Sequence, residues 1–405
     1  MRIVHILYLL VFVLTFLLPN HTFAQADSTT YHHILTVLTE SKGKYVSDKR
    51  TKILEIQTAN IQANEYSILS TEKEALDFIH EKVSNLPARI SYTLLPDASV
   101  GNKRHGVVNL SVANLRTYPS HAAEMATQLL LGTQVDLLQY KDGEYRVRTP
   151  EGYIAWVPTS SVTAMDEAEI KTWKSTPKLL YTEEFGKAYS QPDKHSTRVS
   201  DLVYGNILSI VDRSSDFYKV KYPDGRIAYI PQKEGLPFEQ WKASRHLTSN
   251  NLINSAKSML GLPYLWGGTS VKGVDCSGLT KTAFYMNGYI IPRDASQQVL
   301  VGEQIDILDE NGNFDSQKAL KNLNPGDLIF FAAGKNRSPK ARVTHVALYI
   351  GEGEFIQAAG LVRINSFLTE KDNYDDFQTR TVVAARRYIG TSDPQVQSID
   401  KSSYY

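Results

Sequence analysis

The chain has 405 residues, of which 44 are basic and 43 acidic, so its formal net charge is +1. This balance gives no field that would attract nucleic acid or an anionic membrane surface, and we expect neither as a partner. The length exceeds what one hydrophobic core usually supports, and 23 tyrosines and 16 prolines favour several β-rich modules over a helical bundle.

Residues 1–24 have the layout of a secretory signal peptide. Arg2 precedes the apolar run 3–18, a proline and an asparagine end that run, and Ala24 offers a small residue for cleavage. A membrane anchor is the alternative, but the run is shorter than the ~20 residues that span a bilayer. We therefore expect an exported chain, periplasmic or extracellular, with no membrane anchor after signal cleavage.

Residues 25–100 are expected to form a small N-terminal α+β unit. Residues 50–59 and 65–70 alternate in the manner of strands. Thr71 with Glu74 three residues on has the pattern of a capping box. The apolar residues after it repeat at helical spacing: Ala75, Leu76, Ile79 and Val83. Nothing in this unit indicates chemistry.

The middle third contains an internal repeat. Residues 129–158 align without a gap on residues 202–231, and each copy carries a Pro-Glu-Gly or Pro-Asp-Gly hairpin tip. Short strands with such turns predict small β-barrels, which we place at 101–165 and 175–235. The copies resemble the bacterial SH3-like modules of cell-wall proteins.

The two copies differ at one position of interest. Tyr153 of the first copy corresponds to Arg226 of the second. An aromatic side chain with a hydroxyl suits the wall of a ligand site. Ordinary drift on a solvent-exposed face is the alternative interpretation.

The single cysteine, Cys276, lies in the segment GVDCSGLTKT, after a glycine-rich loop and before a helical run that ends at Asn287 and Gly288. Because no second cysteine exists, an internal disulfide is excluded. At a helix N-terminus, unpaired N–H groups and the helix dipole favour the thiolate. The position therefore predicts a nucleophile, and a buried inert thiol is the alternative.

A base for this thiol is predicted on a β-hairpin. His345 precedes a Gly-Glu-Gly turn at 351–353, and the register that places Ile350 opposite Glu354 brings Gln357 diagonal to His345 on the same face. An imidazole oriented by a polar side chain is the base that a cysteine nucleophile uses.

Four motifs carry a resemblance to a known family. GLPYLWGGTS…DCSGL, IPRDASQQ, NPGDLIFF and THVALYIGEGEFIQAAG occur in order within residues 245–390. This region resembles the NlpC-type cell-wall cysteine peptidase family, which has a papain-like fold. With the two barrels before it, the chain is similar to exported γ-D-glutamyl-L-diamino-acid endopeptidases. The fold class implied is α+β, with a papain-like catalytic domain after two SH3-like barrels and the N-terminal unit.

The resemblance implies roles for individual residues. Cys276 matches the nucleophile and His345 the base, while Gln357 occupies the orienting position where the family most often has a histidine. An amide oxygen can still accept from the imidazole N–H. Tyr264 and the backbone N–H of Cys276 match the oxyanion donors.

The resemblance also implies how substrate binds. In this subgroup the first barrel closes one end of the cleft, so that only a stem peptide with a free N-terminal L-alanine fits. Asp275, Tyr153 and Glu124 match the groups that meet the ammonium, which needs a counter-charge when buried. Asp275 is also a candidate helix N-cap. Expected cleft walls are Trp266, Ser277 and Ser296. Arg293 and Asp294 form a candidate structural pair.

Peptidoglycan fragments are accordingly the expected partners, no metal or other cofactor is expected, and the chain is expected to be a monomer with a flexible tail at 391–405. The implied reaction releases L-Ala-D-Glu from peptidoglycan stem peptides. Two alternatives stay open: a cell-wall-binding protein with a weak or inactive peptidase domain, and an endopeptidase that cuts intact stems.

Overall fold

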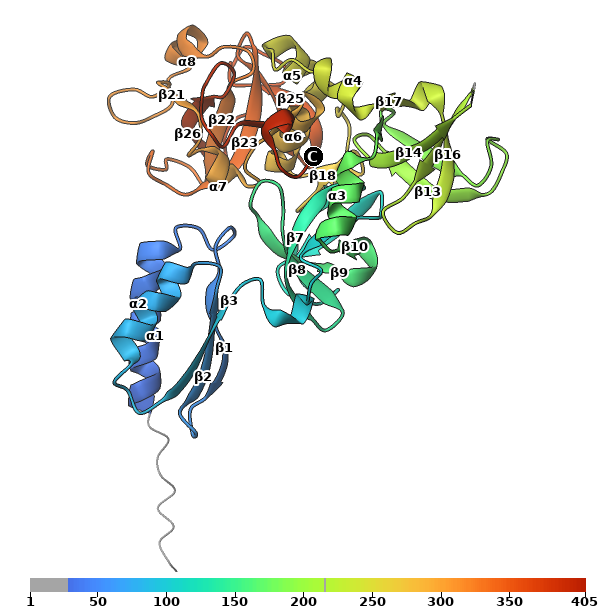
Figure 1. Ribbon diagram of the computed structural model, residues 1–405. Helices are drawn as coiled ribbons and strands as arrows, with labels where there is room; N and C mark the ends of the chain where they lie inside the picture. The colour runs from blue at the N-terminus through green and yellow to red at the C-terminus, as the bar shows by residue number, and fades with distance from the viewer. Residues whose placement is uncertain (1–27, 215) are drawn as a thin grey trace, which may run out of the picture. The chain divides into compact units, whose positions relative to one another are not determined.

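The computed structural model describes residues 28–405 except residue 215, and it divides into two units (Figure 1). One unit contains the described residues up to Ser47 together with Leu54–Thr93, and the other contains Asp48–Ile53 together with Leu94–Tyr405. The predicted signal peptide lies outside the described residues. Within the described part of the chain, no helix has the length and apolar character needed to cross a bilayer.

The first unit is α+β, as predicted, and consists of a sheet covered by two helices (Figure 1). The sheet has the order β1-β2-β3, and its elements are α1 (Ser28–Tyr45), β1 (Leu54–Asn60), β2 (Glu65–Ser70), α2 (Lys73–Val83) and β3 (Arg89–Leu94). The four apolar residues at helical spacing on α2 are all buried. The predicted capping box is wrong, because the Thr71 hydroxyl donates to the Glu72 carboxylate at 2.9 Å and Glu72 takes the N-cap position.

The second unit begins with two sheets that confirm the internal repeat. The first has the order β10-β4-β7-β8-β9-β5-β6, and the second has the matching order β17-β11-β14-β15-β16-β12-β13. The strands of the first are β4 (His105–Val108), β5 (Val112–Arg116), β6 (Met125–Leu130), β7 (Gln134–Lys141), β8 (Glu144–Arg148), β9 (Ile154–Pro158) and β10 (Val162–Met165). Those of the second are β11 (Lys178–Tyr181), β12 (Phe185–Tyr189), β13 (Arg198–Val203), β14 (Ile207–Arg213), β15 (Phe217–Lys221), β16 (Ile227–Pro231) and β17 (Gly235–Pro237). Helix α3 (Glu167–Ser175) connects them.

The two sheets meet at a repeated glycine. Gly132 has φ 84° and its repeat equivalent Gly205 has φ 87°, a region that favours glycine. A Cβ on Gly132 would lie 2.2 Å from the carbonyl oxygen of Ile207. The Ile207 N–H donates to the carbonyl of Leu131 at 2.8 Å, so the absence of a side chain at Gly132 permits this close backbone contact.

The C-terminal domain is built on a sheet of order β21-β26-β22-β23-β24-β25. Its strands are β21 (Glu303–Ile305), β22 (Leu328–Ala333), β23 (Val343–Gly351), β24 (Glu354–Ala359), β25 (Leu361–Ser366) and β26 (Arg380–Arg387). Its helices are α4 (Phe238–Ala243), α5 (Ser249–Lys257), α6 (Cys276–Met286), α7 (Ala295–Gln298) and α8 (Ser316–Asn322). Short strands complete it: β18 (Thr269–Ser270), β19 (Gly273–Val274), β20 (Tyr289–Ile290) and β27 (Gln397–Ser398).

Both faces of this sheet are buried. Val346 and Leu348 of β23 join the apolar cluster that contains α6, whereas Ala347 and Tyr349 join a second cluster on the other face. Helix α6 packs against β23 and β24, which brings the start of the helix next to the hairpin (Figure 1). The chain therefore has the mixed α+β fold that was predicted, with a papain-like C-terminal domain.

The expectation of a flexible tail at residues 391–405 is wrong. Strand β27 pairs with β20, Ile399 is 2% exposed, and the ring of Tyr405 packs on Phe238 and Tyr285. The hydroxyl of Tyr404 donates to Asp136 at 2.6 Å. The tail was predicted to be flexible because most of its residues are polar, but a few apolar and aromatic residues hold it in place.

Candidate active site

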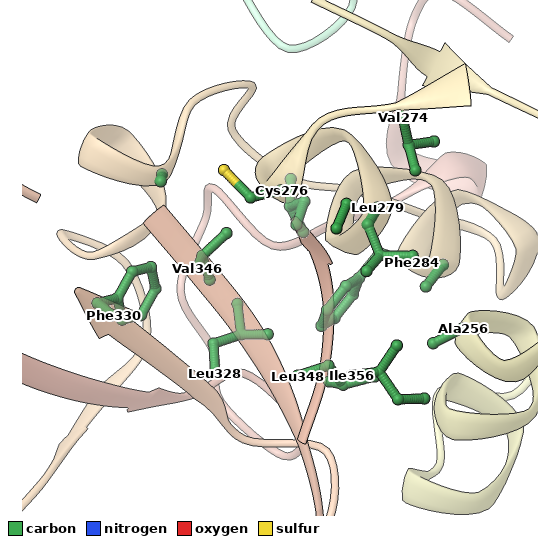
Figure 2. Close-up of a cluster of buried hydrophobic side chains, with 14 of the residues drawn as sticks. Ala256, Val274, Cys276, Leu279, Phe284, Leu328, Phe330, Val346, Leu348 and Ile356 are labelled. Atoms are coloured by element: carbon green, nitrogen blue, oxygen red, sulfur yellow. The ribbon is translucent and has the colours of Figure 1, made fainter. Parts of the chain in front are cut away.

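The candidate nucleophile lies at the first residue of α6, as predicted. Asp275 is the N-cap, and its carboxylate accepts from the N–H of Gly278 at 2.7 Å. A Cβ on Gly278 would lie 1.9 Å from the carbonyl oxygen of Gly268, so the helix start packs directly on the preceding loop. Figure 2 shows Cys276 at the edge of the apolar cluster with Val346 nearby, and the residue is 7% exposed.

The thiol is protonated in this environment. Burial and then the carboxylate of Asp275 raise the pKa of Cys276 to about 11, although hydrogen bonds from the Val346 and Ser277 N–H groups lower it. The Ser277 N–H at the helix N-terminus favours the thiolate, as predicted, but burial and the charge of Asp275 outweigh it, so the predicted net preference for the thiolate is wrong. The hydrogen bond from the Val346 N–H brings the sulfur to the backbone of β23, at the residue that follows His345.

The candidate base has the predicted partner. His345 Nε2 and Gln357 Oε1 are 2.7 Å apart. Leu348 pairs with Ile356, so the next pair along the hairpin is Ala347 with Gln357, as predicted. The register differs from the prediction at the turn, where a bulge pairs Glu354 with Gly351 in place of Ile350.

The orientation of the Gln357 amide is fixed by its other contacts. Its Nε2 donates to Asn365 Oδ1 at 2.8 Å and to Asp375 Oδ2 at 3.1 Å, and the residue is 0% exposed. An amide nitrogen only donates and an amide oxygen only accepts, so Oε1 faces the imidazole and His345 Nε2 carries a hydrogen. The Nδ1 of neutral His345 is then the nitrogen with a free lone pair.

The imidazole is neutral at rest. Burial and then the charge of Arg380 lower the pKa of His345 to about 4, against smaller opposing effects of Gln357 and Asp375. Arg380 forms an ion pair with Asp375 behind the amide. Because the thiol and the imidazole are both neutral at rest, we expect the proton of Cys276 to move when substrate is attacked, without an ion pair formed beforehand.

Tyr264 is close enough to the nucleophile to interact with it electrostatically. It is half-buried and forms an isolated bridge with Val274, two residues before Cys276. Burial and then electrostatic interactions with Cys276 and Asp275 raise the pKa of Tyr264. The phenol therefore keeps its proton and can donate a hydrogen bond.

Asp275 is saturated by structural contacts. Its Oδ1 accepts from Arg293 Nη1 at 3.1 Å and from Ser277 Oγ at 3.2 Å, besides Gly278, and its Oδ2 accepts from Arg293 Nη2 at 2.7 Å and from Gly267 N at 2.9 Å. Arg293 is 1% exposed. The predicted pairing of Arg293 with Asp294 is secondary, since that separation is 3.8 Å.

The first SH3-like sheet contributes directly to this region. Thr127 Oγ1 accepts from Arg293 Nε at 2.9 Å, and Gln128 Oε1 accepts from Thr269 N at 3.1 Å. Tyr153, which immediately precedes β9, is 8% exposed, and burial, followed by Asp294, raises its pKa. The structure thus brings Tyr153 beside Asp294 and Arg293, within two residues of the α7 start.

The remaining predicted residues have different surroundings. Ser277 is buried and accepts from Arg293 Nη1 at 3.0 Å. Ser296 accepts from Arg50 at 2.8 Å. Trp266 is 61% exposed, and Glu124 is also exposed, on the segment between β5 and β6. The backbone carbonyl of Glu124 accepts a hydrogen bond from the N–H of Thr117.

Sequence reasoning missed several residues that support the site. They are Asp48, Arg50, Asn365, Asp375 and Arg380. None lies in a recognisable motif. Asn365 lies on β25 and Arg380 begins β26, whereas Asp48, Arg50 and Asp375 reach the site from loops whose path the sequence does not specify.

This combination of fold and site defines a cysteine peptidase of the NlpC/P60 family, to which the chain belongs. Residues 261–386 match the NlpC/P60 family. Residues 115–162 match the bacterial dipeptidyl-peptidase Sh3 domain, and residues 186–235 match the bacterial SH3 domain. These are the domains predicted from the sequence motifs and the internal repeat.

Two curated relatives and one solved structure illustrate the similarity. A gamma-D-glutamyl-L-lysine dipeptidyl-peptidase of Bacillus cereus is 32% identical over 59% of this chain and 68% of its own length. Dipeptidyl-peptidase 6 of Lysinibacillus sphaericus is 27% identical over 69% of this chain and 98% of its own. The crystal structure of an NlpC/P60 family protein from Bacillus cereus has a TM-score of 0.57 at 26% identity, covering 70% of this chain and 99% of that one.

Proposed function

We propose that this peptidase hydrolyses the γ-D-glutamyl–diamino acid bond of peptidoglycan stem peptides that begin with a free L-alanine, and that it releases L-Ala-D-Glu. The names of the two dipeptidyl-peptidase relatives support this reaction. The observation that carries it is the position of Tyr153, which lies between β8 and β9 of the first SH3-like sheet and beside Asp294 and Arg293. A barrel residue at this place would close the cleft to substrates that extend beyond the alanine.

In this proposal Cys276 Sγ attacks the γ-carbonyl carbon while its proton passes to Nδ1 of His345. The negative oxygen that develops accepts from the Tyr264 hydroxyl and the backbone N–H of Cys276. The C–N bond then breaks, and His345 gives its proton to the leaving amine. The resulting thioester holds L-Ala-D-Glu through its γ-carbonyl.

The second half of the reaction reverses these roles. Water gives a proton to His345 and attacks the thioester carbonyl, the C–S bond breaks, and the proton returns to the sulfur of Cys276. Gln357 acts by holding the Nε2–H of His345, so that Nδ1 faces the nucleophile throughout.

The ammonium of the alanine is proposed to lie against Tyr153 and the neighbouring carboxylates, with Trp266, Ser277 and Ser296 as cleft walls. Asp275 is assigned to the same group, but its charge is paired with that of Arg293 and its oxygens are occupied by Arg293 and backbone N–H groups. Glu124 is assigned to the same end of the cleft. We also propose that the chain is exported, as is typical of cell-wall hydrolases.

Mass spectrometry of the reaction products tests this function. Purified protein would be given L-Ala-γ-D-Glu-diaminopimelate, the lysine counterpart, and the N-acetylated form of each, with Cys276→Ala as control. Release of L-Ala-D-Glu from unblocked peptides alone, lost in the control, is the expected result. Equal cleavage of blocked and unblocked peptides would favour an endopeptidase on intact stems, and no cleavage would favour a wall-binding protein.

A further inference from the structure

The segment Asp48–Ile53 belongs to the second unit, although its neighbours in the chain do not. Its backbone is joined to the residue after Tyr153, because the N–H of Ile154 donates to the carbonyl of Arg50 at 2.7 Å. A six-residue segment from near the chain's start therefore lies beside the candidate ammonium site.

The Arg50 side chain forms a fork between carboxylates. Its Nε and Nη2 donate to Asp48 at 2.8 and 2.6 Å, and its Nη1 donates to Asp294 Oδ2 and Ser296 Oγ, both at 2.8 Å. Asp48 is itself held by Gln297 Nε2 at 2.8 Å. These contacts fix the orientation of the Asp294 carboxylate, which in turn interacts with the phenol of Tyr153.

The charges around this fork favour a cation. Arg50 neutralises Asp48, and the buried Arg293 neutralises Asp275. With Asp294, the group has three carboxylates and two guanidinium groups, so its net charge is −1. The Asp294 carboxylate is partly exposed, at 28% of its side chain. Asp294 is also paired with Arg50, so an ammonium placed here would meet a group of net charge −1, with one partly exposed carboxylate and one phenol oxygen, both held in position.

We infer that Arg50 is a positioning residue of the substrate site, and that the segment Asp48–Ile53 is a second wall that closes the amino-terminal end of the cleft. Arg50 holds Asp294 against Tyr153, so that the pair receives the N-terminal ammonium of the stem peptide. This inference rests on the proposed function and adds a specificity determinant outside the barrels and the peptidase domain.

Steady-state kinetics on free and N-acetylated L-Ala-γ-D-Glu-diamino acid peptides test the inference. For Arg50→Ala we expect KM for the free peptide to rise at least tenfold while kcat stays within threefold. Arg50→Lys keeps the charge but loses the planar fork, and the same rise in KM is expected. The matched control is Arg198→Ala, an exposed arginine on β13, which should behave as the wild type. A KM within twofold of wild type in Arg50→Ala, or full recovery in Arg50→Lys, would overturn the positioning role.

A binding measurement separates this inference from the proposed reaction. Calorimetry with L-Ala-D-Glu, using Cys276→Ala with and without Arg50→Ala, should show at least a tenfold weaker Kd when Arg50 is absent. If the wild type hydrolyses neither peptide while binding still depends on Arg50, the proposed function fails and the inference stands. If hydrolysis is as proposed and Arg50→Ala binds and cleaves like Arg198→Ala, the inference alone fails.

Discussion

The contact between His345 and Gln357 allows a quantitative prediction for Gln357→Leu. Leucine has a similar volume but cannot accept from His345 Nε2, and the site is 0% exposed, so water does not replace the lost acceptor. A hydrogen bond to a charged group contributes about 1.5–3 kcal/mol, and the imidazole becomes charged only as the reaction proceeds. At about 1.4 kcal/mol for each factor of ten, kcat should fall roughly 10- to 150-fold with KM unchanged.

The matched control for this change is Gln357→His. A neutral imidazole accepts at one nitrogen and donates at the other, so it can serve His345 and Asp375 as the amide does. We expect its kcat to stay within about tenfold of the wild type on L-Ala-γ-D-Glu-diamino acid peptides. A Gln357→Leu enzyme with a kcat within about twofold of wild type would refute the assignment of Gln357 as the residue that orients His345.

Three further predictions concern pH and stability. Folding lowers the pKa of His345 from an ordinary value of ~6.5 to about 4, so the unfolded chain binds more protons between these two pH values. The free energy of unfolding should therefore rise with pH through that window, by at most about 3 kcal/mol. Urea unfolding of His345→Gln should lack this rise, and an identical pH dependence in both proteins would contradict the assignment. Because the pKa of Cys276 is raised to about 11, its alkylation by iodoacetamide should be slow at pH 7 and still accelerate above pH 9, whereas a fast rate already constant at pH 7 would show a resting thiolate. Arg293→Met leaves the buried charge of Asp275 without its partner and should destabilise the second unit by about 3–5 kcal/mol in urea unfolding. The double variant Arg293→Met with Asp275→Asn should lose less stability. Equal losses of stability in the single and double variants would argue against the ion pair.

Local signals explain which parts of the fold were predictable. The two SH3-like sheets were predictable from the repeated hairpin tips at residues 150–152 and 223–225. Each tip is a local turn that pairs the strands on either side of it. The same applies to the hairpin register that brings Gln357 to His345, and to the helix start at Cys276. These features depend on contacts between residues close in sequence.

The features that escaped prediction depend on distant contacts. Asp375 reaches Gln357 through the loop after β25, and Arg50 reaches Asp294 across 244 positions of sequence. The protonation of Cys276 was predicted in the wrong direction, because the helix dipole is visible in the sequence whereas burial depends on the packed sheet. The tail was predicted to be flexible for the same reason, since Tyr405 is fixed by residues of two distant segments.

Trapping the covalent intermediate tests the central claim most directly. Acid-quenched reactions with L-Ala-γ-D-Glu-diamino acid peptide would be digested and analysed by mass spectrometry for an acyl group on the peptide that contains Cys276. The account predicts an L-Ala-D-Glu adduct on Cys276, absent in Cys276→Ala and absent when the substrate is N-acetylated. Continued release of L-Ala-D-Glu by Cys276→Ala, or an adduct of equal yield from the N-acetylated peptide, would contradict it.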